Sequence, residues 1–323
     1  MRVLVTGANG FVGASVCRAV ALAGHEVRAM VRPGAHDEDL PPDVERVQGD
    51  VTVAASLGPC VEGVDAIVHT AGVKHATRPS TFQRVNVDGT AHLAEASLAA
   101  GVGRFVLVST IAAQGPSPLG GAHVSAGSEA PINDYGRSKL AAEQRLLALR
   151  PEGTTILRPS LLYGPVDDHL LVWARMVRRR VVPVVPELPL SFLHVDDLAA
   201  LVVRVLAHPD PAPGPFFVSD GEPTTMGAVI DHLERVLDSG PTLRVPLPAG
   251  RLAVLAPVVE GFARASGLGA LAGRRLGEMA ASGWVCLSGA AHEAFGFHPT
   301  HRLVEDLPGA IGGYRSAGLL PPT

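Results

Sequence analysis

The segment VLVTGANGFVGASVCRAV (residues 3–20) constrains the fold of this chain more than any other. A short β-rich run passes into a helical pattern through a turn that carries Gly7, Gly10 and Gly13. In such a turn the first glycine lets the chain reverse, the second lets the backbone approach a pyrophosphate, and the third lets helix and strand pack closely. The first amides of the following helix would face the phosphates. The turn therefore predicts a dinucleotide site, with a glycine-rich turn that binds nothing as the alternative.

Strand-like and helical patterns alternate through the first half of the chain. Compact apolar runs predict strands at 3–7, 26–31, 44–50, 65–72, 104–110 and 154–159. Helices are expected between them at 11–23 and 86–100. Because these strands are continuously apolar and separated by helices, they indicate a parallel sheet covered on both faces, and therefore an α/β fold.

The pattern becomes irregular beyond residue 160, where prolines are more frequent. Further strands are expected at 191–195 and 215–220, and further helices at 196–207 and 225–237. We therefore expect a dinucleotide-binding domain over residues 1–160 and a smaller substrate-binding lobe over residues 161–323, with about 191–220 returning to the sheet.

Composition indicates which kinds of partner and which cellular compartment to expect. The formal net charge is −4 and the sequence pI is about 6.3, so no strongly basic face for nucleic acid is expected. Three widely spaced cysteines argue against disulfides and a zinc site and fit a reducing compartment: Cys17, Cys60 and Cys286. The chain enters a strand at once and holds no uncharged apolar run long enough for a bilayer. A cytoplasmic protein without a membrane span is expected.

The stretch DYGRSKLAAE (134–143) places Tyr135 and Lys139 four residues apart, on one face of a helix. A free tyrosine titrates near ~10, too high to exchange protons easily at neutral pH. A nearby ammonium favours the phenolate and lowers that pKa, which makes the phenol a usable acid and base. The pair alone favours a solvated helix face. Combined with the glycine turn and the order of strands, it predicts a proton-transfer site.

Several motifs follow one another in a telling order between residue 3 and about residue 220: TGANGFVG, HTAG, NVDGT, YGRSK, LRPSLLYGP and FLHVDDLA. This order resembles the extended short-chain dehydrogenase/reductases, the NAD-dependent epimerase/dehydratase family. The stretches 216–226 and 283–307 resemble the 3β-hydroxysteroid dehydrogenase-like subgroup, which includes reductases of long-chain keto acids. The resemblance implies a doubly wound parallel Rossmann sheet with a smaller, mostly C-terminal substrate lobe, a nicotinamide cofactor and a homodimer.

The resemblance also implies which residues contact the cofactor: Gly7, Asn9, Gly10, Phe11, Val12, Gly13, Arg32, Asp50, Val51, Thr70, Ala71, Gly72, Tyr135, Lys139 and Pro159. The family's acidic residue at the end of the second strand, which selects NAD, is replaced by Val31, with Arg32 beside it. A guanidinium binds a 2′-phosphate that a carboxylate would repel, so NADP is favoured over NAD. The alternative is that Arg32 stacks on adenine or points into water. Asp50 is expected to accept from the adenine amino group, or to cap a turn.

The catalytic set that the resemblance implies is Thr110, Tyr135, Lys139 and Asn86. Thr110, five residues before Gly115, would hydrogen-bond the substrate oxygen, with Ser109 as second choice and a simple strand cap as the alternative. Asn86 matches an asparagine that holds the active-site helix or a relay water; a helix N-cap is the alternative. Tyr135 would exchange a proton with the substrate oxygen while hydride passes between nicotinamide C4 and the carbonyl carbon.

Two motif histidines, His69 and His194, are expected to be structural, and no metal-ligand spacing occurs. The glycine- and proline-rich loop at 115–133 is expected to form a wall or lid beside the substrate, or else a disordered connection.

The substrate is the least constrained feature. Nucleotide-sugar epimerases of this family carry Arg-Asp-aromatic where this chain has 190–192, Leu-Ser-Phe. The arginine that binds the diphosphate is therefore missing, unless another replaces it: Arg175, Arg178 or Arg251. A lobe rich in Leu, Val and Ala suits an apolar pocket, or an ordinary core.

The expected function is an NAD(P)-dependent oxidoreductase that interconverts a secondary alcohol and a ketone on a small or apolar substrate. A nucleotide-sugar epimerase or dehydratase that uses NAD transiently is the alternative. The intact Tyr135/Lys139 pair argues against a third possibility, a catalytically silent cofactor-binding regulator.

Overall fold

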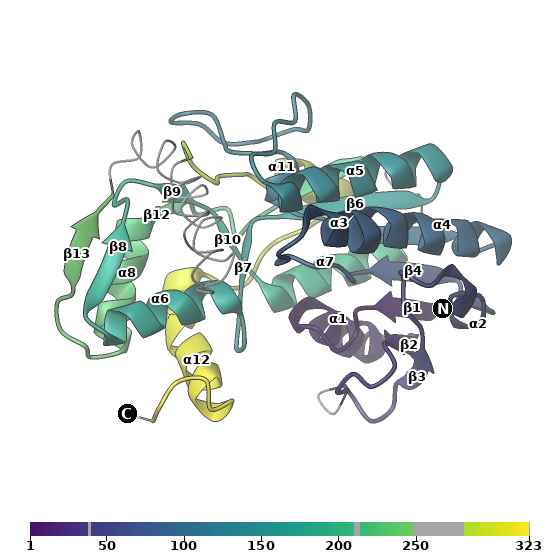
Figure 1. The fold of residues 1–323 in the computed structure, drawn as a ribbon, viewed down its shortest axis with the longest axis horizontal. Helices are drawn as coiled ribbons and strands as arrows, with labels where there is room; N and C mark the ends of the chain where they lie inside the picture. The colour runs from purple at the N-terminus through teal and green to yellow at the C-terminus, as the bar shows by residue number, and fades with distance from the viewer. Residues whose placement is uncertain (38–39, 210–213, 248–280, 323) are drawn as a thin grey trace.

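A computed structural model describes residues 1–37, 40–209, 214–247 and 281–322. The predicted parallel sheet is present: seven parallel strands lie in the order β11-β6-β5-β4-β1-β2-β3. Figure 1 shows the part of this order that runs from β4 past β1 and β2 to β3. They are β1 (Arg2–Thr6), β2 (Glu26–Val31), β3 (Glu45–Gln48), β4 (Ala66–His69), β5 (Arg104–Val108), β6 (Thr154–Pro159) and β11 (Pro215–Val218). The order reverses between β1 and β4, and a doubly wound sheet binds its ligand in the crevice at such a reversal.

Alternate residues of β1 face the two sides of the sheet, and both sides are covered by helices (Figure 1). Val3 and Val5 pack in one core with α1 (Phe11–Leu22) and α7 (Val195–Ala207). Leu4 packs in a second core with α4 (Gly89–Ala99) and α5 (Asp134–Leu149). All three side chains are fully buried. Burial on both faces explains why these strands lack a polar alternation, and it confirms the predicted α/β class.

Short elements connect the strands to these helices. They are α2 (Gly58–Val61), α3 (Pro79–Phe82), the 3-10 turns Ala54–Ser56 and Ile111–Ala113, and the π-helical turn Gln83–Asp88. The helix predicted at 86–100 therefore begins as a π-helical turn and becomes α-helical only at Gly89.

The smaller lobe has a core of its own, contributed mainly by residues beyond 160. It contains α6 (Asp168–Arg178), β8 (Val181–Val184), β9 (Pro189–Leu190), β12 (Thr224–Thr225), α8 (Met226–Val236), β13 (Leu243–Pro246) and α12 (Leu303–Ser316). Helix α11 (Gly289–Phe295) packs back against β11 and α7 of the sheet domain.

The strands expected at 191–195 and 215–220 have different partners. The first, β10 (Phe192–His194), pairs with β7 (Leu161–Tyr163) in a separate two-stranded sheet. Only the second, β11, extends the large sheet, beside β6. The expectation that about 191–220 returns to the sheet is thus wrong for β10, whose partner is β7 and not a strand of the large sheet. A domain boundary near residue 160 stays a prediction.

Among the helices of the described ranges, none combines the length and apolar character that a bilayer span requires. The three cysteines are buried free thiols, as their wide spacing predicted: Cys17, Cys60 and Cys286.

Candidate active site

The glycine turn between β1 and α1 leaves room for a ligand to approach the backbone. Gly7 has a φ of +66°, which side-chain-bearing residues rarely adopt. A Cβ at Gly13 would lie 2.1 Å from the Gly7 carbonyl oxygen, so only glycine lets the helix start this close to the strand. The Gly10 amide donates to the Gly7 oxygen at 2.9 Å, and α1 begins at Phe11. This cradle at a helix N-terminus fits a pyrophosphate.

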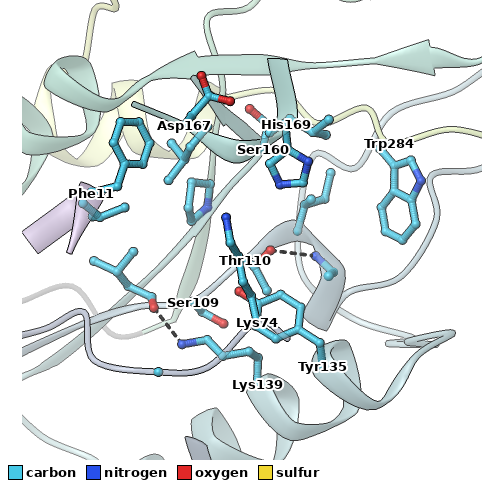
Figure 2. A pocket seen from close by; sticks show the side chains of 18 of the residues that line it. Phe11, Lys74, Ser109, Thr110, Tyr135, Lys139, Ser160, Asp167, His169 and Trp284 are labelled. Atoms are coloured by element: carbon cyan, nitrogen blue, oxygen red, sulfur yellow. Dashed lines mark hydrogen bonds between the residues drawn. The ribbon is translucent and has the colours of Figure 1, made fainter. Parts of the chain in front are cut away.

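A cavity of about 730 Å³ opens beside this turn, at the carboxyl ends of β1, β4, β5 and β6 (Figure 2). Of the residues predicted from the sequence, it is lined by Gly7, Gly10, Phe11, Val12, Gly13, Thr70, Gly72, Thr110, Tyr135, Lys139 and Pro159. Residues far apart in the chain therefore meet in one site.

The other predicted residues lie outside this lining: Asn9, Arg32, Asp50, Val51, Ala71 and Asn86. Asn9 ties the glycine turn to the segment after β2, because its side-chain amide donates to the His36 carbonyl at 2.8 Å. Val51 is buried in the second core, and the Ala71 amide donates to the Thr6 hydroxyl at 3.3 Å. Asn9 and Ala71 are each next in sequence to a lining residue, Gly10 and Thr70 respectively.

Two residues bear on the adenosine end of the expected cofactor. Arg32 follows the last residue of β2 and is exposed. Asp50 accepts, through Oδ1, hydrogen bonds of 2.8 Å from both the amide and the hydroxyl of Thr52. Asp50 therefore caps a turn, the alternative that the sequence left open, and its contact with adenine stays a prediction.

Tyr135 and Lys139 lie in the first two turns of α5, which begins after Asn133 caps the Gly136 amide at 2.8 Å. Tyr135 is half-buried, lines the cavity and packs against Phe82. Lys139 is buried, and its Nζ donates to the Val108 carbonyl at 2.8 Å (Figure 2). Burial lowers the pKa of Lys139 to about 8, against the opposing effect of the Glu143 carboxylate. The sequence pair thus becomes a phenol and a buried amine facing one cavity.

The end of β5 presents two hydroxyls to this cavity, and they have different partners. Ser109 donates its hydroxyl hydrogen to the Glu143 carboxylate in the interior. Thr110 accepts from the Ala112 amide at 3.2 Å, which leaves its hydroxyl hydrogen for another partner. Between the two candidates from the sequence, the geometry favours Thr110.

A buried polar network that sequence reasoning missed lies behind these hydroxyls. Arg158, 1% exposed, pairs with Glu143 at 2.6 Å and donates to Gln114 at 2.7 Å. It also reaches Glu129 at 3.2 Å. The single charged residue in the buried strand TTILRP was the available signal, because a buried charge needs a partner.

The same network anchors the loop at 115–133 through Glu129. His123 of that loop forms an isolated β-bridge with Cys286 and stacks on Phe217, with ring centroids 5.4 Å apart. The loop is therefore an ordered connection, in contrast to the disordered alternative.

Asn86 holds the active-site helix in place. Within the π-helical turn, its Oδ1 accepts from the Val73 amide at 2.8 Å. Its Nδ2 donates to the Val73 carbonyl at 3.0 Å and to the Ser138 hydroxyl of α5 at 2.9 Å. The N-cap alternative is wrong, because Asp88 is the residue before α4. Asn86 is a positioning residue that joins the β4 end to α5.

The two motif histidines make internal contacts. His69 is fully buried between the hydroxyls of Thr6 (2.6 Å) and Thr90 (3.0 Å), and burial lowers its pKa to about 3. His194 accepts from the Asp196 amide at 3.2 Å and stacks on His301 with ring centroids 4.1 Å apart. Neither lines the cavity.

The opposite wall of the cavity is apolar and was not assigned residue by residue from the sequence. Its residues come from several segments of the small lobe: Trp173, Met176, Pro183, Leu188, Leu190, Met226 and Trp284. Polar groups on the lining include Lys74, Ser160, Asp167 and His169 (Figure 2). Asp167 is buried and accepts from the Leu170 amide at 2.9 Å and from the Tyr314 hydroxyl. Burial raises the pKa of that carboxyl.

Among the described residues, no arginine lines the cavity. Arg175 and Arg178 are exposed, and Arg175 donates to the Leu319 carbonyl at 3.0 Å. Arg251 lies outside the described residues. The missing arginine of nucleotide-sugar enzymes is therefore not replaced by Arg175 or Arg178.

Comparison with known proteins agrees with this geometry. The NAD dependent epimerase/dehydratase family model matches residues 3–218. The UDP-glucose 4-epimerase of Vibrio cholerae is 30% identical over 76% of this chain and 78% of its own. The ceramide reductase of Caulobacter vibrioides is 30% identical over 99% of this chain and 96% of its own.

Two further relatives extend the likeness. The 3-beta-hydroxysteroid dehydrogenase of Mycolicibacterium neoaurum is 33% identical over 70% of this chain and 67% of its own. The crystal structure of gox2253 matches with a TM-score of 0.82 and 26% identity, over 98% of this chain and 99% of that one. The chain therefore belongs to the NAD-dependent epimerase/dehydratase family, as an NAD(P)-dependent extended short-chain dehydrogenase/reductase with 3β-hydroxysteroid dehydrogenase-like relatives.

Proposed function

We propose that this protein interconverts a secondary alcohol and a ketone on an apolar substrate, with NADP as its preferred cofactor. The observation that carries the proposal is the contrast across one cavity. Tyr135, Thr110 and Lys139 lie on one side, and the other side is built largely from Trp, Met, Leu and Pro side chains. Such a wall favours a hydrophobic body and offers a diphosphate no arginine from the described residues.

Each polar residue has a role in this reaction. Tyr135 transfers the proton to the ketone oxygen, or removes it from the alcohol. Lys139 keeps a positive charge near the phenol and so favours its ionised form. Thr110 donates its remaining hydrogen to the substrate oxygen, where negative charge develops. Asn86 acts through Ser138, by holding α5 at the distance that these contacts require.

The cofactor would be held by the glycine cradle, whose close backbone approaches a Cβ would block. When bound, the nicotinamide supplies or accepts the hydride. The residues at the end of β2 support a preference for NADP. The buried Val31 stands there in place of an acidic residue, and the exposed Arg32 follows it. A guanidinium at this place suits a 2′-phosphate.

A second candidate function is a nucleotide-sugar epimerase, favoured by the likeness to the Vibrio cholerae UDP-glucose 4-epimerase. The cavity lining argues against it, since the described part of the chain brings no guanidinium to this space. Likeness to the Caulobacter vibrioides ceramide reductase, over nearly the whole chain, agrees better with an apolar substrate.

The experiment that tests the proposal is a thermal-shift panel followed by turnover. A ligand that binds only the folded state raises the melting temperature, so NADP, NAD, UDP and dTDP are compared at equal concentration. We expect the largest shift with NADP, little with the nucleotide diphosphates, and NADPH oxidation with long-chain or steroidal ketones. A large shift with UDP, together with conversion of UDP-glucose, would favour the epimerase instead.

A further inference from the structure

We propose that His169 is a specificity-determining residue of the catalytic cavity. Its imidazole hydrogen-bonds a second oxygen that the substrate carries near its reacting carbon, and the apolar tail of the substrate lies along the rest of α6. The inference rests on the proposed function and names the class of its substrate, an amphiphilic alcohol or ketone. His169 lies in the first turn of α6 and is the single histidine among the described residues that line the cavity.

Helix α6 turns one face toward the cavity. His169, Trp173 and Met176 follow one another at positions i, i+4 and i+7, and all three are half-buried and line the cavity. Residues at this spacing form one stripe along a helix. The opposite stripe packs in the core of the small lobe and consists of Leu170, Leu171, Ala174 and Val177. The cavity face of α6 therefore carries one polar ring followed by two apolar side chains.

This stripe has a direction, because α6 runs away from the glycine turn. Before the helix, Gly164 approaches α1 so closely that a Cβ would lie 3.1 Å from the ring of Phe11, which lines the cavity. From there α6 leads toward β8, on the far side of the small lobe (Figure 1). At 1.5 Å of rise per residue, Met176 stands roughly 10 Å beyond His169 along the helix axis. His169 is therefore at the end nearer the expected cofactor.

Asp167 holds the start of α6 in place. Its Oδ1 accepts from the Leu170 amide at 2.9 Å, and its Oδ2 accepts from the Gly164 amide at 3.2 Å and from the Tyr314 hydroxyl. Both oxygens of this carboxylate are thus engaged by donors of the protein. Among the described residues of α6, the His169 ring is the polar side chain that the helix adds to the lining.

The place of the His169 ring defines the chemistry that it can recognise. Figure 2 shows the ring projecting into the cavity, across the view from Tyr135 and Lys139. In the proposed reaction Tyr135 and Thr110 contact the reacting oxygen, so a group that meets His169 at the same time is a second oxygen of the same molecule. An imidazole N–H donates to a carbonyl, carboxylate or hydroxyl oxygen, and the N-terminal turn of a helix favours such an acceptor.

The test compares three secondary alcohols with the same tail: β-hydroxymyristate, its methyl ester, and 2-tridecanol, which lacks the carboxyl group. NADP reduction gives kcat and KM for each with the wild type, His169→Leu and His169→Gln. The matched control is His232→Leu, because His232 is also a half-buried histidine on a helix of the small lobe, α8, but lies outside the lining. Melting temperatures and NADP dissociation constants show that each variant is folded.

We expect the wild type to have a roughly tenfold lower KM for β-hydroxymyristate or its ester than for 2-tridecanol. His169→Leu should remove this difference by raising the KM for the oxygenated alcohols, with kcat and NADP affinity unchanged, and His169→Gln should restore part of it. His232→Leu should keep the wild-type values. An effect on the acid alone shows that His169 binds a carboxylate, and an equal effect on acid and ester shows that it binds a neutral oxygen.

Met176→Ala tests the direction of the tail. The loss of apolar surface at the far end of the stripe should raise the KM for β-hydroxymyristate about threefold to tenfold. The KM for β-hydroxybutyrate should not change, because its chain is too short to reach Met176. An equal rise for both acids would contradict the proposed orientation.

The inference is overturned if the wild type has the same KM for all three alcohols, or if His169→Leu keeps the wild-type difference between them. An equal change for all three in His169→Leu, with weaker NADP binding, would show a purely structural residue and would overturn it as well. Failure of the proposed function has another sign: the wild type reduces NADP with none of the alcohols, and UDP-glucose raises its melting temperature. The inference would then fall with the function on which it rests.

Discussion

The two walls of the catalytic cavity are built in different ways. The sheet-side wall comes from short motifs at strand ends, and steric limits and hydrogen bonds hold it: the glycine turn, the Asn86 contacts and the Arg158–Glu143 pair. The lobe-side wall is apolar and assembled by packing from scattered segments of the small lobe. In the proposed reaction, the first wall supplies the groups that need fixed distances, and the second wall binds the apolar body of the substrate. Changes on the two walls should therefore have separable effects.

Gly13→Ala should give the largest effect of the variants that alter cofactor or substrate binding. The added Cβ would lie 2.1 Å from the Gly7 carbonyl oxygen, so the turn must open. Overpacking of this kind costs roughly 1–3 kcal/mol, and we expect about a 100-fold loss of cofactor affinity with a lower melting temperature. The control is Gly309→Ala in α12, where the Cβ meets open space and both properties should hold. If Gly13→Ala binds the cofactor with wild-type affinity, the glycine turn does not hold the cofactor.

Trp173→Ala changes the other wall. Trp173 is half-buried, lines the cavity and packs edge-on against Phe192, with ring centroids 6.4 Å apart. Loss of this apolar surface should raise the KM for a long-chain ketone roughly tenfold and leave NADPH affinity unchanged. The exposed Leu243, outside the cavity, supplies the control as Leu243→Ala. Steady-state kinetics with a short and a long ketone test this expectation. If Trp173→Ala and the wild type have the same KM for the long ketone, the apolar wall does not contribute to substrate binding.

The pH dependence of Lys139 separates activity from stability. Its pKa, lowered from 10.5 to about 8 by burial, means that the folded protein loses this proton before the unfolded chain does. Between about pH 8 and 10.5 the unfolded state binds more protons, so this group increases stability as pH rises. Activity should move the other way, with kcat/KM falling about fivefold from pH 8 to pH 9 as the ammonium is lost.

Thermal unfolding and kcat/KM over this pH range test the opposite trends. Lys139→Met should abolish the rise in stability that this residue causes. An alkaline limb that starts well above pH 9 would contradict the assigned role.

Arg32→Ala should have the smallest effect. The side chain is exposed, and water and salt screen its attraction for a phosphate. We expect NADP affinity to fall about threefold to fivefold, with NAD affinity unchanged and the loss smaller at high salt. The control is Arg18→Ala, which removes an exposed guanidinium elsewhere, on helix α1. Unchanged NADP affinity in Arg32→Ala would refute the cofactor preference.

The difference between the walls also explains what the sequence predicts. Gly7, Thr70, Thr110, Tyr135 and Lys139 stand in local motifs, and parallel strands carry their carboxyl ends to one edge. Local spacing predicted the α/β sheet, the glycine turn and the Tyr135/Lys139 pair, whereas Thr70 and Thr110 were named from the family resemblance. Asn86 was also named from the family resemblance. Whether it caps a helix or holds α5 in place could be decided only from its hydrogen-bond partners in the structure.

The lobe-side wall could not be predicted in this way, because nothing local connects Trp173 with Trp284 or Met226. The apolar pattern of β10 fits a strand of either sheet, and its pairing with β7 is seen only in the structure.

The most direct test of the account is single-turnover oxidation of bound NADPH by Tyr135→Phe, with an apolar ketone that the wild type reduces. We predict that the variant binds NADPH with wild-type affinity, because the aromatic ring remains in place, while NADPH oxidation, followed at 340 nm, slows by roughly 10²–10⁴-fold. Oxidation at the wild-type rate would mean that the proton comes from another group, and the role given to Tyr135 and Lys139 would be wrong.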